Sequence, residues 1–373
     1  AAHLYFAQSE QLPTRFALSF GRSTLPVYER QLFPETVLGE LAVNPMKAGT
    51  TVFETDALRL WVLDAYPTVA IASIKSKMHA LGADVLAGMQ RAVAEAEANF
   101  AALVIWQEAP FAVGANLAEA LAALKAGQLT EFEGSVAQFQ KTSLAIRYSQ
   151  VPVVAAVDGM ALGGGCEFVM YANKRVATLE SYIGLVEVGV GLLPAGGGLA
   201  LLAARAARDA ALQGYSDSFP IIRKYFQQAA MGEVSKSALN ALEMGYLREG
   251  DVVVFNPQEL LTAALIEAKA MADNGYRPPL PATQIPVAGY TGIATLKMML
   301  VNMKEGGFIS DHDYDIASRI ATVLCGGEVE PGSMVNEDYL LKLERQHFVA
   351  LAKTEKSQAR IDHMLKSGKP LRN

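Results

Sequence analysis

The chain has 373 residues, of which 51% are hydrophobic and 19% are charged, as in a globular, ordered protein. This length allows a large core and one to three domains. The net charge of −6, from 32 basic and 38 acidic side chains, argues against a general nucleic-acid-binding protein.

The two cysteines, Cys166 and Cys325, are too few for a disulfide framework, and this favours a reducing compartment. No apolar run approaches the roughly 18 to 20 residues that cross a bilayer. The first residues also lack the basic head and apolar middle of a signal peptide. We therefore expect a cytoplasmic protein without membrane insertion. The absence of a methionine before Ala1 is compatible with a longer native chain.

Residues 1–55 contain four scattered prolines and little periodicity, so we expect an N-terminal linker or arm. Residues 56–274 form the predicted core. Within it, alternating apolar positions at 58–62 and 69–73 flank a turn and predict a β-hairpin. Apolar residues at three- and four-residue steps over 85–96 then predict a helix.

Two short, continuously apolar segments, 102–106 and 151–157, predict strands that are covered on both faces. A long helical stretch, 117–148, lies between them. This order predicts an α/β fold with a parallel sheet and crossover helices.

The proline-rich segment 276–281 marks a predicted boundary, and residues 275–373 are predicted to be a C-terminal helical region with amphipathic helices at 294–303 and 339–351. The cluster Ser310-Asp311-His312-Asp313 could suggest a metal site. We favour an N-capped helix start, because no second His or Cys stands at ligand spacing, and we predict no metal.

The most informative segment is 157–167, with the sequence Val-Asp-Gly-Met-Ala-Leu-Gly-Gly-Gly-Cys-Glu. A buried strand runs into a loop whose three glycines precede a predicted helix. Glycine lets the backbone approach a ligand closely, and N–H groups at a helix start favour negative charge. Glu167 lies in the first turn of this helix.

A second glycine-rich segment, 183–198, carries one carboxylate, Glu187, 20 residues after Glu167. Neither segment fits a nucleotide-binding motif. The third glycine of G-x-G-x-x-G is replaced in each register that we tested, by Phe168, Pro194 or Leu201. The single Gly-Lys pair, at 368–369, is followed by proline and not by Ser or Thr.

A third segment, Phe-Ala-Val-Gly-Ala at 111–115, follows the first buried strand and opens the next helix. Two such turns on neighbouring strands can each offer a backbone N–H to the same oxygen atom, which is the geometry of an oxyanion hole.

These three segments together resemble the crotonase (enoyl-CoA hydratase/isomerase) superfamily over about residues 56–274. The resemblance implies the ClpP/crotonase-like ββα superhelix. It also implies that the N–H groups of Ala115 and Gly164 form the oxyanion hole, that Glu167 and Glu187 are the catalytic carboxylates, and that Ala195 positions the water. For the coenzyme A moiety we assign Ala112 and the cations Lys75 or Lys77.

The implied reaction is the addition of water to a trans-2-enoyl-CoA, giving a 3-hydroxyacyl-CoA in β-oxidation. Two carboxylates flanking one water can supply both the base and the acid, and a close pair in a dry pocket holds a single proton. We expect Glu167 to be the more easily ionised of the two, because it lies near a helix N-terminus. Hydration needs no cofactor, and coenzyme A is part of the substrate.

Two alternatives stay open at this stage. The first is another crotonase activity, an enoyl-CoA isomerase or an acyl-CoA hydrolase, and the second is a catalytically silent acyl-CoA-binding module. The C-terminal sequence also resembles a subgroup in which an NAD-dependent 3-hydroxyacyl-CoA dehydrogenase precedes the crotonase part. We therefore expect an acyl-CoA substrate and, as further partners, other copies of the chain or an upstream dehydrogenase domain that would hold the NAD.

Overall fold

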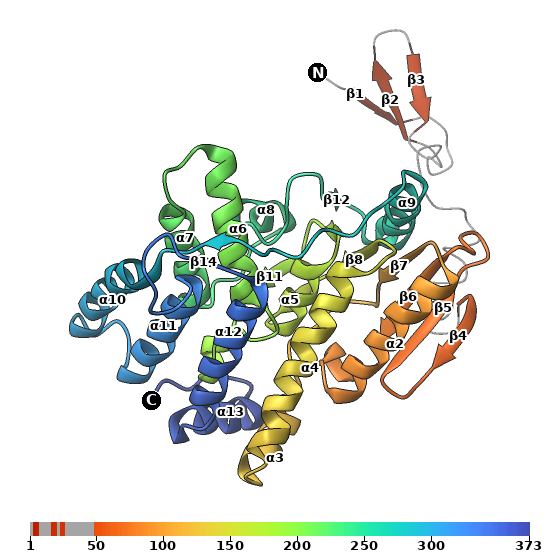
Figure 1. The fold of residues 1–373 in the computed structure, drawn as a ribbon. Coiled ribbons are helices and arrows are strands. Elements are labelled where there is room, and N and C mark those ends of the chain that lie inside the picture. Colours follow the sequence, from red (N-terminus) through yellow and green to blue (C-terminus); the bar gives the residue numbers. More distant parts are fainter. Residues whose placement is uncertain (1–2, 7–15, 21–22, 27–47) are drawn as a thin grey trace.

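The computed structural model describes residues 3–6, 16–20, 23–26 and 48–373 (Figure 1). Three N-terminal strands form an antiparallel sheet in the order β1-β2-β3, and they span His3–Phe6, Phe16–Phe20 and Ser23–Pro26. Most of the predicted N-terminal arm lies outside the described residues.

A seven-stranded sheet organises the rest of the chain, in the order β12-β10-β8-β7-β6-β5-β4. Its members are β4 (Thr50–Glu54), β5 (Leu58–Val62), β6 (Val69–Ile74), β7 (Ala102–Ile105), β8 (Val153–Val157), β10 (Lys174–Thr178) and β12 (Val252–Val254). The strands from β6 to β12 are parallel neighbours, whereas β4, β5 and β6 are paired antiparallel. Because β4 begins at Thr50, the sheet starts inside the segment that was predicted to be an arm.

The two faces of this sheet pack into different clusters, as expected for strands that are apolar throughout. Leu103 and Ile105 of β7 point to the face covered by α2 (Ala83–Asn99), α4 (Leu129–Tyr148) and α5 (Gly164–Tyr171). Ala102 and Val104 point to the opposite face, which α9 (Leu260–Asp273) covers. The predicted hairpin, parallel sheet and crossover helices are thus confirmed.

The long helical stretch predicted over 117–148 is two helices, α3 (Leu117–Lys125) and α4. The break falls at Gly127, whose φ of 71° lies in the left-handed region that ends helices. The remaining helices of the core are α6 (Gly198–Gln213), α7 (Phe219–Met231) and α8 (Ala238–Met244), and three 3₁₀ turns are η3 (Lys77–His79), η4 (Glu187–Val190) and η5 (Pro257–Glu259).

A small parallel pair, β9 (Met160–Leu162) and β11 (Tyr182–Gly184), stands apart from the large sheet. Its two strands lead directly to the two predicted glutamates. β9 ends next to the start of α5, which carries Glu167, and β11 ends just before η4, which begins at Glu187. This pair therefore brings the two glycine-rich segments together.

The C-terminal region is helical, as predicted, and comprises α10 (Gly289–Glu305), α11 (Asp311–Leu324), α12 (Glu337–Ala352) and α13 (Glu355–Ser367), with a short ladder of β13 (Ile285–Pro286) and β14 (Met334–Val335). Ser310 and Asp313 form a reciprocal capping box at the start of α11, so the predicted N-cap is confirmed.

These C-terminal helices share one hydrophobic core with the preceding part of the chain. Leu296, Ile316, Val349 and Ile361 belong to the same buried cluster as α5 and the inner face of the sheet. Figure 1 shows α11 and α12 lying beside α6, and α13 beside α3. The composition of the sequence changes at residue 275, but the hydrophobic core continues across this position. In the part of the chain that the structure describes, no helix combines the length and the apolar composition of a membrane span.

Candidate active site

The loop between β7 and α3 presents the N–H of Ala115. The residues on either side of Ala115 form hydrogen bonds with Leu81, in the connection between β6 and α2. Leu81 N–H donates to Gly114 O at 2.8 Å, and Asn116 N–H donates to Leu81 O at 3.1 Å. Among the hydrogen bonds of the described residues, the Ala115 N–H is not a donor. It is therefore fixed in direction and available to a ligand.

The turn from β9 into α5 presents the N–H of Gly164. Gly163 has a φ of 54°, and its N–H donates to Gly184 O at 2.8 Å. Gly164 is the first residue of α5, so its N–H has no acceptor within the helix. A Cβ built on Gly114 would lie 3.9 Å from Gly164 N, which shows that the two turns are adjacent. The structure thus brings together the two predicted oxyanion donors.

Glu167 is only 2% exposed, and its carboxylate is anchored at one oxygen. Oε1 accepts hydrogen bonds from Gly196 N at 2.8 Å and Gly198 N at 2.7 Å, where the second glycine-rich segment enters α6. These two bonds leave Oε2 as the oxygen for other chemistry.

Glu187 lies at the start of η4 and reaches the same place from the other side. A Cβ on Gly163 would lie 2.9 Å from its Oε1, so this carboxylate passes close to the backbone of the turn that leads into α5. Its Oε2 is buried and, among the described residues, has no hydrogen-bond partner. An unpaired buried carboxylate oxygen is costly, and it indicates a place for a water or a substrate group.

A third carboxylate, Glu344 of α12, belongs to the same buried acidic group. It is 0% exposed and accepts hydrogen bonds from Gly197 N at 2.7 Å and Ala200 N at 3.0 Å. We refer to Glu167, Glu187 and Glu344 as the acidic cluster.

Burial raises the pKa of every member of the acidic cluster. The pKa values of Glu187 and Glu344 rise to about 7, first through burial and then, for Glu187, through the charge of Glu344. The pKa of Glu167 is raised well above its ordinary value by burial, and the charges of Glu187 and Glu344 raise it further. Loss of solvation at Glu167 outweighs the two N–H bonds that its carboxylate accepts. The expectation that Glu167 is the more easily ionised of the two residues stays a prediction. The cluster retains protons at neutral pH.

One cavity of about 830 Å³ joins these groups. Its lining includes the predicted residues Ala115, Gly164, Glu167, Glu187 and Ala195. The N–H of Ala195 is not a hydrogen-bond donor among the described residues, so it too is available to a bound water.

The three residues assigned to coenzyme A lie elsewhere. Lys75 donates to Glu54 Oε1 at 2.6 Å and to Thr55 O at 2.8 Å, and neither it nor Lys77 is among the described residues that line the cavity. Ala112 is likewise outside the lining, and its backbone bonds to Met160 O and Leu162 N. The structure does not bring these three residues to the acidic cluster.

The C-terminal helices supply a wall of the cavity that sequence reasoning missed. Its apolar members are Leu300, Ile309, Ala317, Phe348, Met364 and Leu371. Phe348 stacks on Phe132 of α4, with ring centroids 5.8 Å apart. Two cationic residues of the same C-terminal region, Arg360 and Arg372, also line the cavity.

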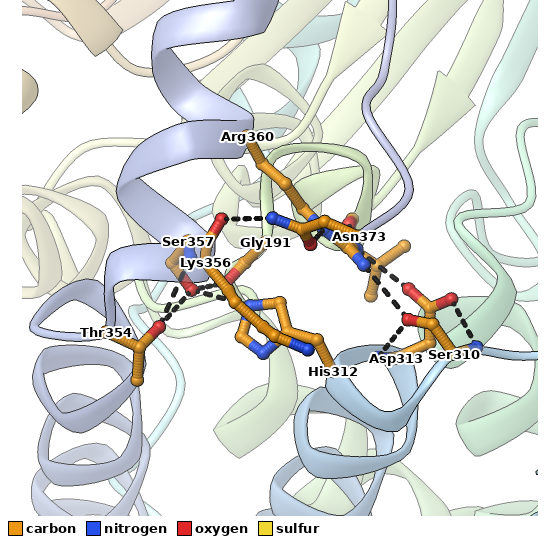
Figure 2. Close-up of polar contacts among 10 residues, drawn as sticks. Gly191, Ser310, His312, Asp313, Thr354, Lys356, Ser357, Arg360 and Asn373 are labelled. Atoms are coloured by element: carbon orange, nitrogen blue, oxygen red, sulfur yellow. Dashed lines mark hydrogen bonds and ion pairs between the residues drawn. The ribbon is translucent and has the colours of Figure 1, made fainter.

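Arg360 connects this wall to the segment that carries Glu187 (Figure 2). It is 1% exposed and donates to Asp313 Oδ1 at 2.7 Å, to Asn373 Oδ1 at 2.8 Å and to Val188 O at 3.3 Å. Beside it, Ser357 Oγ donates to the carbonyl of Gly191 and lies 3.0 Å from His312 Nε2. Two carbonyls of the Glu187 segment are thus held by α13.

Glu344 was also missed, although the sequence carries a signal for it. It follows Leu340 by four residues and precedes Phe348 by four, so it stands on the apolar face of its helix. A charged residue on such a face requires buried partners. The sequence could not show that these partners are amides about 145 residues earlier.

Comparison with known proteins supports the fold and the family. Residues 66–214 match the family model described as enoyl-CoA hydratase/isomerase. An enoyl-CoA hydratase from Bacillus halodurans superposes with a TM-score of 0.54 at 16% identity, covering 82% of this chain and 99% of that one. At this identity the likeness shows the fold alone, and it confirms the predicted crotonase-like α/β architecture.

Two curated relatives are much longer than this chain. A probable 3-hydroxyacyl-CoA dehydrogenase of Bacillus subtilis is 41% identical over 313 residues, which are 84% of this chain and 39% of the relative. A protein of Rickettsia felis named as a putative fatty acid oxidation complex trifunctional enzyme is 35% identical over 159 residues, which are 42% of this chain and 22% of that protein. The chain therefore spans well under half the length of either relative.

Proposed function

Because the chain belongs to the crotonase superfamily, we propose that it is an enoyl-CoA hydratase, which adds water to a trans-2-enoyl-CoA to give a 3-hydroxyacyl-CoA. The observation that carries this proposal is the convergence of Glu167 and Glu187 on one cavity beside the N–H groups of Ala115 and Gly164. Hydration needs both parts, a pair of acid–base groups and a site for a developing oxyanion.

In this proposal each part of the site has its own role. The thioester oxygen accepts hydrogen bonds from the two N–H groups, so negative charge that develops on it is stabilised. Each donor of this kind contributes about 10²- to 10³-fold to the rate. A water held between the two carboxylates adds through oxygen to Cβ, one carboxylate accepts its proton, and the other delivers a proton to Cα.

The raised pKa values of Glu167 and Glu187 suit a mechanism in which one carboxylate is the base and the other is the acid. Two carboxylates that face each other in a dry site do not both ionise near neutral pH, so the pair holds one proton and one charge. With its pKa near 7, Glu187 changes its charge in the working range of a cytoplasmic enzyme. The pair thus enters the reaction with a base and an acid present together.

The apolar C-terminal wall supports an acyl-CoA substrate. The fatty-acyl part of such a substrate is apolar, and Leu300, Ala317 and Phe348 provide a matching surface in the same cavity as the glutamates. We propose this wall as the acyl end of the site.

We further propose that this chain is the hydratase part of a longer β-oxidation protein that also contains an NAD-dependent 3-hydroxyacyl-CoA dehydrogenase. The name of the Bacillus subtilis relative and the 39% of its length that this chain spans support the proposal. Oxidation of the 3-hydroxyacyl product would be the next reaction of that protein. The test is the full-length gene, and a gene without a dinucleotide-binding fingerprint upstream would contradict the proposal.

The hydratase proposal is tested with crotonyl-CoA, by following the loss of the conjugated enoyl absorbance. We expect the wild-type chain to be active and Glu167→Gln and Glu187→Gln each to reduce kcat by about 10²- to 10⁴-fold, since each variant removes one acid–base group. Undiminished rates in both variants would remove the mechanism. An inactive wild type that still binds the thioester would instead identify a silent acyl-CoA-binding module.

A further inference from the structure

The turn from Gly196 to Ala200 is held by two carboxylates that come from opposite sides. The N–H groups of Gly196 and Gly198 point to Glu167, whereas those of Gly197 and Ala200 point to Glu344. From Gly196 to Gly198, successive N–H groups thus alternate between Glu167, which lines the cavity, and Glu344, which does not.

Glu344 lies behind the turn and is not one of the described residues that line the cavity. It is completely buried on α12. Its Oε1 accepts a second hydrogen bond from Gln140 Nε2 at 3.1 Å, and Gln140 Oε1 in turn accepts one from Arg345 at 2.6 Å. Any effect of Glu344 on chemistry must therefore pass through the turn.

The peptide units of Gly197 are constrained on both sides. Its N–H donates to Glu344, and its carbonyl accepts a hydrogen bond from Tyr171 Oη at 3.0 Å. A Cβ at this position would lie 2.3 Å from Tyr171 Oη, and its φ of 106° requires glycine. Tyr171 lies four residues after Glu167 on α5. The same helix therefore carries both the hydroxyl that holds the Gly197 carbonyl and the Glu167 carboxylate.

We propose that Glu344 is a positioning residue for Glu167. By fixing the peptide between Gly196 and Gly198, it aims their two N–H groups at Glu167 Oε1 and so leaves Glu167 Oε2 directed at the reacting atoms. This inference rests on the proposed hydratase function and deepens it. It makes the C-terminal helical region part of the catalytic apparatus, because α12 supplies the group without which the turn lacks its rear acceptor.

Glu344→Gln is the sharpest test, because it keeps the size of the side chain. Either orientation of the new amide places an NH₂ group against a backbone N–H donor. A displacement of this kind near reacting groups costs about 10²-fold in rate. We expect kcat with crotonyl-CoA to fall about 10²-fold and KM to change by less than about threefold. Glu344→Asp retains both acceptor oxygens and should recover part of the loss.

Glu337→Gln is the matched control. Glu337 lies on the same helix, is buried, and accepts a hydrogen bond from Tyr148 Oη at 2.7 Å. Its pKa is also raised, chiefly by burial. It does not contact the turn, so we expect kcat within about twofold of the wild-type value. A kcat that stays at the wild-type level in Glu344→Gln, or that falls equally in Glu337→Gln, would overturn the proposal.

Amide hydrogen exchange of residues 196–200 provides a readout that needs no activity. We expect faster exchange in the Glu344→Gln protein than in Glu337→Gln, because one of the two N–H groups, that of Gly197 or that of Ala200, loses its acceptor. If the wild type does not hydrate crotonyl-CoA, the proposed function fails, and the exchange rates alone decide whether Glu344 holds the turn. Equal exchange in the two variants would refute the inference. If Glu344→Gln does not fold, Gln140→Leu replaces it in the test. This variant removes one donor to Glu344 and should produce a smaller loss of kcat.

Discussion

Residues 66–214 and the C-terminal helical region, 275–373, contribute to the same cavity in different ways. The first segment matches the enoyl-CoA hydratase/isomerase family model and carries both glycine-rich turns with Glu167 and Glu187. The second supplies an apolar wall, the buried Arg360 and Glu344. In the proposed mechanism, the groups that touch the reacting atoms come from local motifs, whereas the groups that hold those motifs in place come from remote helices.

The largest expected effect is a loss of kcat on substitution in the turn from Gly196 to Ala200. A Cβ added at Gly196 would lie 2.4 Å from Glu167 Oε2 and 2.4 Å from the Phe139 ring, so Gly196→Ala must displace the carboxylate. We expect kcat to fall about 10²- to 10³-fold. Gly134→Ala is the comparison within the same cavity. A Cβ there meets nothing within 4 Å, so the loss of activity should be much smaller than in Gly196→Ala. Equal activities in the two variants would contradict the geometry of the turn.

The C-terminal helices hold the segment that carries Glu187, and this contribution can be measured as a free energy of unfolding. Arg360→Met leaves Asp313 without its buried cation and frees Val188 O, and we expect the free energy of unfolding to fall by about 2–4 kcal/mol. The measurement is urea unfolding at neutral pH.

Lys366→Met on the same helix is the comparison for Arg360, because its ion pair with Asp362 is exposed. Such a surface pair contributes little, so the variant should unfold like the wild type. A similar loss in both variants would mean that Arg360 is no more than a surface charge.

The proton content of the acidic cluster should appear in the pH dependence of stability. Folding raises the pKa of Glu187 from 4.5 to about 7, so the native state binds this proton more tightly than the unfolded state. Its stabilising contribution is complete below pH 4.5 and is lost as the pH rises through 7. Glu187→Gln lacks this loss and should gain stability relative to the wild type, by about 1–3 kcal/mol, between pH 5 and pH 8. A difference that does not change with pH would contradict the raised pKa.

The smallest expected effect concerns the apolar wall. Ala317→Leu fills part of the proposed acyl end, so kcat/KM for a 2-decenoyl-CoA should fall about 10-fold while that for crotonyl-CoA stays unchanged. Hydration assays with the two thioesters make the comparison within one variant. Equal losses for both substrates would place Ala317 away from the end of the acyl chain.

Much of the fold and of the reacting site was predictable from local patterns. The apolar runs at 102–106 and 151–157 are neighbouring parallel strands, and the turns that follow them bring Ala115 and Gly164 together. The assignment of Lys75 to coenzyme A stays a prediction, and in the structure its ammonium group donates to Glu54. A cation's position in a sequence does not determine which carboxylate its long side chain meets.

The sequence by itself determined the elements whose causes are local: strand and helix periodicity, the glycines that must adopt left-handed backbone, and two glutamates set beside them. The tertiary structure alone decided which N–H groups Glu167 accepts from and which Glu344 accepts from, that burial raises their pKa values, and which helices line the cavity. The physical reason is that hydrogen bonding and desolvation depend on distance in space. Gly197 and Glu344, 147 residues apart in the chain, lie 2.7 Å apart between N and Oε1.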